Sequence, residues 1–225
     1  MIGIAVSDNK EWEILLELYN INSEYTEKYI YGSFYRTVFK NNDVIFFKIG
    51  KRKVNAAASI QYMIDKFKFE KIILVGTCTL VSDLDYNDII VPSSVVEYDL
   101  TVREVQPLVL EKNIIELSKV SVGNDYVTGL LGTSDKALMI YKDFLKLKDE
   151  TEIIASDTES AAVAKVCKMN NVDLTIIKGV TDKVFNSEDG FDEQVEVYEE
   201  NLPVVIKNIL ENYLTEVIKW NLEKY

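Results

Sequence analysis

Residues 71–78 (KIILVGTC) form a near-continuous apolar run in the first half of the chain. A run without polar alternation is typical of a central strand that is buried on both faces of a sheet. Further runs at 1–6, 151–157 and 172–182 also read as strands, and helical patterns separate them. Strands that alternate with helices predict an α/β fold: a three-layer α/β/α sandwich with a mixed, twisted central sheet.

The sequence predicts one domain over residues 1–225, because no linker, low-complexity segment or internal repeat interrupts it. Further short strands are expected over 29–50, with a turn at 41–43, over 88–102 around Pro92, and at 126–132. Helices are expected over 7–20, 54–67, 110–120, 136–148, 158–170, and from 192 to the end with an interruption near Pro203.

The chain contains no histidine. This excludes a Ser-His-Asp triad, a Cys-His pair and a histidine-built metal site. Any acid–base chemistry near neutral pH therefore falls to carboxylates, tyrosines, lysines or cysteines. We expect neither a metal nor a cofactor.

The net charge of −12 disfavours nucleic acid and anionic membranes as partners, since both require a basic surface. Cys78 and Cys167 both lie in apolar segments, which favours reduced thiols over a disulfide framework. Residues 1–13 (MIGIAVSDNKEWE) lack a basic region followed by a long apolar run, and no apolar run approaches the ~18 residues of a membrane span. We therefore expect a cytoplasmic protein with a small-molecule partner.

Polar residues follow most of the predicted strands. In a sheet of this kind, ligands bind beyond the carboxyl ends of the strands. Glu11, Thr77, Asp135, Glu159 and Asp182 each follow a different predicted strand. Several acidic groups are therefore expected on one rim of the sheet.

Five segments, in order, resemble the purine nucleoside phosphorylase and nucleosidase superfamily, and are most similar to the methylthioadenosine/S-adenosylhomocysteine nucleosidases. They are IGIAVSDNKEWEILL, IGKRKVNAAASI (resembling G-x-G-K-V-x-A-A), ILVGTCTLVSDLDYNDIIVP, ASDTESAAVAKVC (resembling E-M-E-A-x-x-x-A-x-x-C) and IIKGVTD (resembling V-R-x-[IV]-S-D). The resemblance covers nearly the whole chain. It implies cleavage of the N-glycosidic bond of a purine nucleoside, and a homodimer or larger homo-oligomer.

The resemblance also assigns roles to residues. It makes Asp182 the acid that protonates N7 of the leaving base, Glu159 the carboxylate that grips both ribose hydroxyls, and Glu11 the group that positions or deprotonates water. Such chemistry suits carboxylates, because a buried acid can keep its proton near neutrality and the opening ribose gains positive charge. The further substrate-binding residues that it implies are Asp157, Thr158, Thr181, Ala137, Leu138, Gly76 and Thr77.

Each carboxylate also has a purely structural interpretation. Asp157 and Glu159 stand where helix-capping residues stand, and Glu11 resembles an exposed helix carboxylate such as Glu13. Of Asp157 and Glu159, the family signature favours function for Glu159 only, and Asp157 stands where the family usually has Glu. For Asp182 the structural alternative, a solvated residue that ends a strand, is the less favoured of the two.

The sequence departs from the family pattern around the base. Ala137 and Leu138 stand where relatives often have an aromatic and an apolar residue, so stacking must come from elsewhere, for which Phe185 is one candidate. Thr158 replaces a common Met, and Thr79 a common Gly. Two alternatives to hydrolysis remain: a phosphate-dependent phosphorylase, and a nucleoside-binding sensor with weak catalysis. Hydrolysis is favoured because the chain has only three arginines, and Leu74 stands where hexameric phosphorylases tend to have a phosphate-binding Arg.

Overall fold

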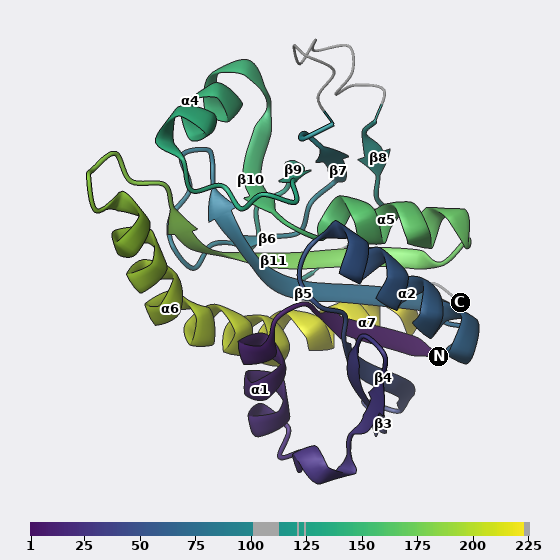
Figure 1. Cartoon of the computed structure of the whole chain (residues 1–225). Coiled ribbons are helices and arrows are strands. Elements are labelled where there is room, and N and C mark those ends of the chain that lie inside the picture. Colours follow the sequence, from purple (N-terminus) through teal and green to yellow (C-terminus); the bar gives the residue numbers. More distant parts are fainter. Residues whose placement is uncertain (101–112, 121, 124, 223–225) are drawn as a thin grey trace.

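The computed structural model describes residues 1–100, 113–120, 122–123 and 125–222. Figure 1 shows a twisted sheet with helices on both sides. The strands of the central sheet are β1 (Ile2–Val6), β4 (Asn42–Lys48), β5 (Lys71–Leu80), β10 (Ile153–Asp157) and β11 (Asp173–Lys183). β2 (Glu27–Tyr29), β3 (Gly32–Phe39), β6 (Ile89–Ile90), β7 (Ser94–Glu97), β8 (Ile115–Glu116) and β9 (Leu130–Thr133) extend it. The predicted α/β sandwich with a mixed sheet is confirmed.

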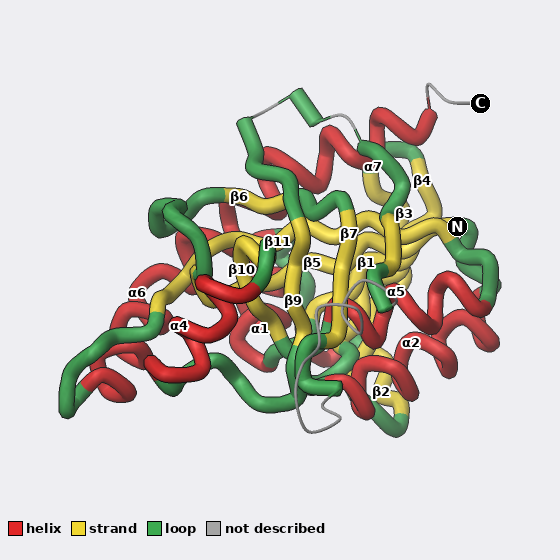
Figure 2. Tube along the Cα trace, turned by 90° about the horizontal axis from the view of Figure 1, so that it is seen from above, coloured by secondary structure: helices red, strands yellow, loops and turns green. Residues whose placement is uncertain are grey.

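β5 is the centre of the sheet. Its first half pairs in parallel with β1, its whole length pairs in parallel with β11, and its last residues pair antiparallel with β10. The strand order β4-β1-β5 continues on the other side of β5 with β11. The carboxyl ends of β1, β5 and β11 therefore meet along one edge. Figure 2 shows the strands of the sheet from above.

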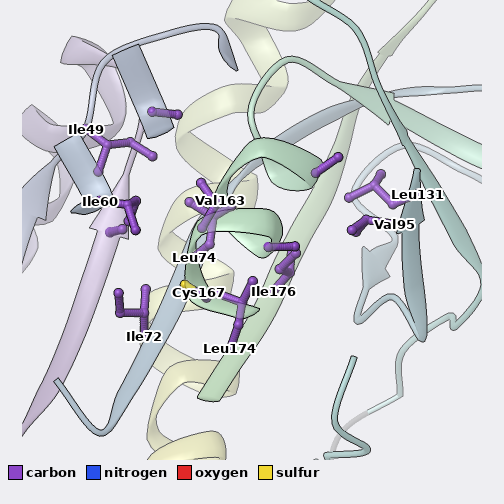
Figure 3. Close-up of a cluster of buried hydrophobic side chains, with 14 of the residues drawn as sticks. Ile49, Ile60, Ile72, Leu74, Val95, Leu131, Val163, Cys167, Leu174 and Ile176 are labelled. Carbon is purple, nitrogen blue, oxygen red and sulfur yellow. The ribbon is translucent and has the colours of Figure 1, made fainter. Parts of the chain in front are cut away.

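Two helical layers cover the sheet because side chains alternate along the strands. On β5, Ile72 and Leu74 face a cluster that includes residues of α2 (Lys53–Phe67) and α5 (Ser160–Met169). Figure 3 shows this cluster around Val163 and Cys167. Ile73 and Val75 face the opposite layer, which is built by α1 (Asn9–Leu18), α6 (Gly190–Asn208), the π-helical turn η2 (Ile209–Tyr213) and α7 (Leu214–Leu222).

Three expectations about secondary structure were wrong. Residues 115–116 form the edge strand β8 instead of part of a helix; residues 110–112 of that expected helix lie outside the described residues. The hairpin turn is Lys40–Asn41, both with positive φ, so Asn42 and Asp43 belong to β4. α6 runs through Pro203, and the interruption comes later, at η2.

Two further differences from the expected elements concern one helix boundary and one short turn. α4 (Tyr141–Glu150) starts five residues after the predicted boundary, and a short 3-10 turn, η1 (Ser23–Tyr25), precedes β2. No helix in the described part of the chain is long and apolar enough to cross a membrane.

Candidate active site

A cavity of about 430 Å³ opens at the carboxyl ends of β1, β5, β10 and β11, a volume suited to a small-molecule ligand. Of the ten residues that the sequence singled out, eight line it: Glu11, Thr77, Ala137, Leu138, Asp157, Thr158, Glu159 and Asp182. Gly76 and Thr181 stand behind this lining. The fold therefore brings together residues that lie far apart in the sequence, from Glu11 to Asp182.

Asp182 is buried at the end of β11, where the pairing with β5 shifts by one residue. This bulge leaves Thr181 unpaired and sets Asp182 opposite Thr79. The Asp182 carboxylate accepts hydrogen bonds from the hydroxyls of Thr79 (2.9 Å) and Thr181 (2.7 Å). Burial raises the pKa of Asp182 above its ordinary value, although the hydrogen bonds act in the opposite direction. Asp182 is therefore not a solvated residue at a strand end.

Gln194, near the start of α6, was not identified from the sequence. It is 2% exposed and lines the cavity. Its side-chain amide donates to Asp182 Oδ2 (2.7 Å) and to the backbone carbonyl of Leu138 (2.9 Å). Gln194 thus fixes the orientation of Asp182 relative to the loop that carries Ala137 and Leu138.

Glu159 is the residue that precedes α5, yet its carboxylate caps no backbone N–H of that helix. It is buried, and its Oε1 accepts hydrogen bonds from the Thr158 hydroxyl and from the backbone N–H of Arg52 (2.9 Å). Burial raises the pKa of Glu159, while the nearby Lys178 ammonium lowers it. The structural interpretation as a helix cap therefore does not apply to Glu159.

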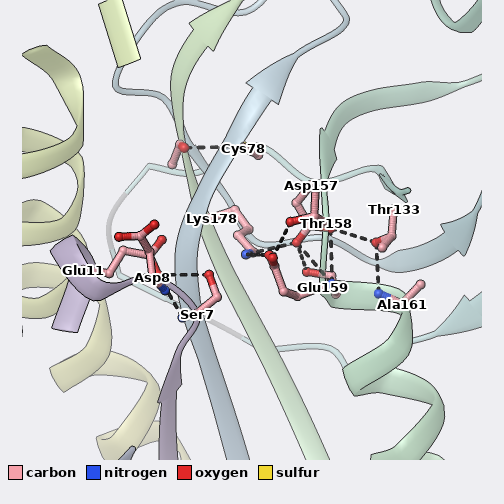
Figure 4. Close-up of polar contacts among 12 residues, drawn as sticks. Ser7, Asp8, Glu11, Cys78, Thr133, Asp157, Thr158, Glu159, Ala161 and Lys178 are labelled. Atoms are coloured by element: carbon pink, nitrogen blue, oxygen red, sulfur yellow. Dashed lines mark hydrogen bonds and ion pairs between the residues drawn. The ribbon is translucent and has the colours of Figure 1, made fainter. Parts of the chain in front are cut away.

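Asp157, in contrast, does hold the start of α5 with its side chain. It accepts hydrogen bonds from the Thr133 hydroxyl (2.7 Å) and from Ser160 N–H (3.2 Å), so it holds the first turn of α5. Its Oδ2 also lies 3.0 Å from Lys178 Nζ, as Figure 4 shows. Asp157 both lines the cavity and anchors the loop before Glu159.

Lys178 is completely buried on β11, with Nζ 3.9 Å from Glu159 Oε2. Burial lowers the pKa of Lys178, but the carboxylates of Asp157, Glu159 and Glu11 outweigh it, and the pKa lies above its ordinary value. Gly76 leaves the room for this arrangement: a Cβ there would lie 2.8 Å from Lys178 Nζ and 3.0 Å from Glu11 Oε1. Lys178 is thus the cation that compensates the buried carboxylates.

Glu11 is buried, whereas Glu13 is exposed, so the structure separates two residues that look alike in the sequence. Glu11 Oε2 accepts from Ser7 N–H (2.9 Å), the Ser7 hydroxyl (3.1 Å) and Asp8 N–H (2.9 Å), forming a capping box at the start of α1. Oε1 makes none of these bonds and faces the Gly76 side of the cavity. Figure 4 shows Glu11 across the site from Glu159.

Two further side chains define the walls. Tyr198 on α6 is the aromatic residue among the described lining residues, and its phenol is hydrogen-bonded to Thr77. Phe185 is not among them; its ring lies 5.3 Å from Lys183 Nζ. Burial strongly raises the pKa of the Cys78 thiol, so this lining residue is not a ready nucleophile. No group of potential metal ligands is found within the described ranges.

The fold and the site define an α/β protein with a carboxylate-rich small-molecule pocket at the carboxyl edge of its sheet. The model of the phosphorylase superfamily matches residues 1–211, and the chain belongs to that family. It is 29% identical over 231 residues to the 5'-methylthioadenosine/S-adenosylhomocysteine nucleosidase of Buchnera aphidicola subsp. Acyrthosiphon pisum (strain Tuc7), covering 95% of this chain and 98% of that protein.

Solved structures share the fold. The futalosine hydrolase of Helicobacter pylori strain 26695 has a TM-score of 0.80 at 19% identity, covering 97% of both chains. The 5'-methylthioadenosine/S-adenosylhomocysteine nucleosidase of Helicobacter pylori, solved with butyl-thio-DADMe-Immucillin-A, has a TM-score of 0.75 at 19% identity, covering 91% of this chain and 92% of that one.

Proposed function

We propose that the chain cleaves the N-glycosidic bond of an adenosine-type purine nucleoside with water, giving the free base and a ribose derivative. The observation that carries this proposal is the arrangement of Asp182, Glu159 and Glu11 around one cavity. Each has a carboxylate held by a different set of hydrogen bonds. The named activities of the relatives and structural neighbours, 5'-methylthioadenosine/S-adenosylhomocysteine nucleosidases and a futalosine hydrolase, support it.

Asp182 is proposed as the general acid. Departure of a purine is easiest when N7 is protonated, and a buried carboxyl group with a raised pKa supplies that proton. After proton transfer, hydrogen bonds from Thr79, Thr181 and Gln194 stabilise the Asp182 carboxylate. The base would then lie over the Ala137–Leu138 loop, with Thr181 acting through Asp182.

Glu159 is proposed as the ribose clamp. A carboxylate accepts hydrogen bonds from both hydroxyls of a ribose, and its negative charge stabilises the positive charge that develops as the glycosidic bond opens. Arg52 N–H and the Thr158 hydroxyl fix Oε1, while Lys178 faces Oε2. Asp157 then serves to hold Lys178 and α5 in place.

Glu11 is proposed to position the attacking water. Its Oε2 is fully engaged in the capping box, which fixes the carboxylate and leaves Oε1 for a water molecule. Gly76 and Thr77 would border this water. Because Glu11 lies across the site from Glu159, water held by Glu11 is placed to approach the ribose that Glu159 binds.

Water is favoured over phosphate as the nucleophile. Leu74, at the position where hexameric phosphorylases tend to have a phosphate-binding Arg, is fully buried and packs in the apolar cluster under α2 and α5. It therefore contributes nothing to the cavity. Among the described residues that line the cavity, a single arginine, Arg52, is found, and its backbone N–H is bonded to Glu159.

The experiment is to incubate the protein with methylthioadenosine with and without phosphate, and to measure free adenine by chromatography. We expect adenine in both cases, with the free sugar as co-product. Strict dependence on phosphate would contradict hydrolysis in favour of phosphorolysis. Binding of the nucleoside without release of adenine would contradict catalysis in favour of a sensor.

We further propose that the protein acts in the cytoplasm as a homodimer or larger homo-oligomer, with its pocket near a subunit interface. The resemblance to the nucleosidases supports this assembly, and the apolar setting of Cys78 and Cys167 suits a reducing compartment. Size-exclusion chromatography with light scattering tests the assembly.

A further inference from the structure

The amide of Gln194 is held in one orientation. Its Nε2 donates to two acceptors on different segments, Asp182 Oδ2 at 2.7 Å and the Leu138 carbonyl at 2.9 Å. Because a carbonyl oxygen only accepts hydrogen bonds, the nitrogen of the amide must be the atom that faces Leu138. The other end of the amide, Oε1, is therefore directed away from these two acceptors.

Oε1 of Gln194 has no partner of its own. The side chain is 2% exposed, and Oε1 accepts no hydrogen bond from the residues that the structure describes. A buried acceptor without a donor is destabilising, so an unpaired oxygen of this kind calls for an explanation. Since Gln194 lines the cavity, the missing donor is best supplied by the ligand.

The order of atoms in this amide matches one edge of a purine. Along that edge, N7 is followed by the substituent on C6 and then by N1. With N7 at Asp182, the neighbouring Nε2 faces the C6 substituent and Oε1 faces N1. The matching base has an acceptor on C6 and an N–H at N1, and a 6-oxopurine such as hypoxanthine has both.

The hydrogens of Nε2 allow this contact. Both are used, one by Asp182 and one by the Leu138 carbonyl. As the general acid, however, Asp182 carries a proton of its own, and its Oδ2 also accepts from the Thr79 hydroxyl at 2.9 Å. The protonated carboxyl group does not need the second donor, so this hydrogen of Nε2 can be shared with O6 of the base.

A 6-aminopurine presents the opposite pattern, with a donor on C6 and an acceptor at N1. It fits when the amide of Gln194 turns by 180°, so that Oε1 accepts from the 6-amino group and Nε2 donates to N1. The amino group then also donates to an acceptor that Nε2 has left, Asp182 or the Leu138 carbonyl. Adenine is therefore still bound, but only a 6-oxopurine fits the amide as it stands.

We infer that Gln194 is a specificity-determining residue that reads the base, and that the pocket takes 6-oxopurine nucleosides as well as adenosine-type ones. The inference deepens the proposed function at the base and rests on it, because it presupposes that Asp182 lies at N7. It assigns to the unpaired Oε1 a partner, the N1–H of the base.

The test compares 5′-deoxy-5′-methylthioinosine with methylthioadenosine, which differ only in the base. Release of hypoxanthine or adenine, measured by chromatography, gives kcat/KM for each, and we expect an inosine-to-adenosine ratio of at least about one in the wild-type protein. In Gln194→Leu the ratio should fall by roughly 10- to 100-fold. The Leu138 carbonyl and Asp182 then face the C6 substituent as acceptors, which suits a 6-amino group and repels O6.

Thr79→Val is the matched control. Thr79 lines the cavity and donates to the same oxygen of Asp182 as Gln194 does, but to no other described group. Its removal should change the rates with both substrates together and leave their ratio at the wild-type value. A role of Gln194 that acts only through Asp182 would likewise leave the ratio unchanged, because both bases depend on the same acid.

The outcomes separate the inference from the proposed function. A wild-type protein that releases adenine but no hypoxanthine overturns the inference alone. So does an unchanged ratio in Gln194→Leu, or an equal fall in Thr79→Val. If Gln194→Leu does not fold, inhibition of the wild-type protein by the free bases decides: hypoxanthine should inhibit at least as strongly as adenine, and clearly weaker inhibition overturns the inference. If neither substrate releases its base, the proposed function fails, and the inference fails with it.

Discussion

The ammonium group of Lys178 lies 3.0 Å from the Asp157 carboxylate, and both side chains are removed from solvent. Buried charges are costly without a partner, and here one cation compensates Asp157 and Glu159 together with the nearby Glu11. Lys178 therefore stabilises the fold, and its positive charge also opposes the burial that raises the pKa of the proposed ribose clamp, Glu159. Stability and function are coupled at this point of the sheet.

Lys178→Met should destabilise the protein by about 3–5 kcal/mol, because it leaves buried carboxylates without their cation. Urea unfolding monitored by circular dichroism measures the free energy of unfolding. Lys148→Met is the control: its pair with Asp83 is exposed, and its loss should cost less than about 1 kcal/mol. Equal effects of the two substitutions would contradict the role of Lys178.

Glu159→Gln should lower kcat/KM for a ribonucleoside by roughly 10- to 100-fold, as expected for the loss of a charged hydrogen bond. The loss should be much smaller for the 2′-deoxyribonucleoside, which lacks one of the hydroxyls that Glu159 is proposed to bind. Adenine release from adenosine and 2′-deoxyadenosine gives the comparison. Equal losses for both substrates would refute the clamp.

Glu11→Gln should lower kcat by roughly 10²–10⁴-fold, because an amide does not accept a proton from water. Substrate binding should persist, since Glu11 is proposed to contact water and not the nucleoside. Glu13→Gln is the matched control on the same helix and should behave like the wild-type protein, because Glu13 is exposed. A Glu11→Gln variant with normal turnover would assign the water to another group.

Gln194→Leu should move the alkaline limb of the pH–rate profile to higher pH. Gln194 donates to Asp182 and lowers its pKa, so its removal raises that pKa further. The acid is active when protonated, and activity is lost as pH rises through its pKa, so the limb shifts upward. Gln61→Leu, which removes a hydrogen bond to Asn170 far from the cavity, should leave the limb in place. A limb that is unchanged in Gln194→Leu would contradict the assignment of Asp182.

Much of the fold could be predicted from the sequence because its signals are local. The apolar run of β5 and the alternating helices determine the layers, and the motif residues fall at strand ends where ligands bind. The short strand β8 could not be predicted, because residues 110–120 have a helical pattern. Pairing of Ile115 with Val95 at the sheet edge overrides that pattern.

The missing parts of the site depend on contacts between distant segments. Gln194 lies in an unremarkable acidic helix, and only the packing of α6 beside β11 brings its amide to Asp182. The distinction between Glu11 and Glu13 depends on which face of α1 is buried. The different roles of Asp157 and Glu159 depend on Thr133 and Lys178, which contact Asp157 from other strands.

The most direct test of the account is the reaction of Asp182→Asn with methylthioadenosine. An amide can still donate a hydrogen bond to N7 but cannot transfer a proton. We predict that this variant binds methylthioadenosine while its rate of adenine release falls by roughly 10²–10⁴-fold. For a nucleoside whose base leaves without N7 protonation, the substitution should lower the rate of base release much less. A near-normal rate of adenine release would show that another residue is the acid and would contradict the account.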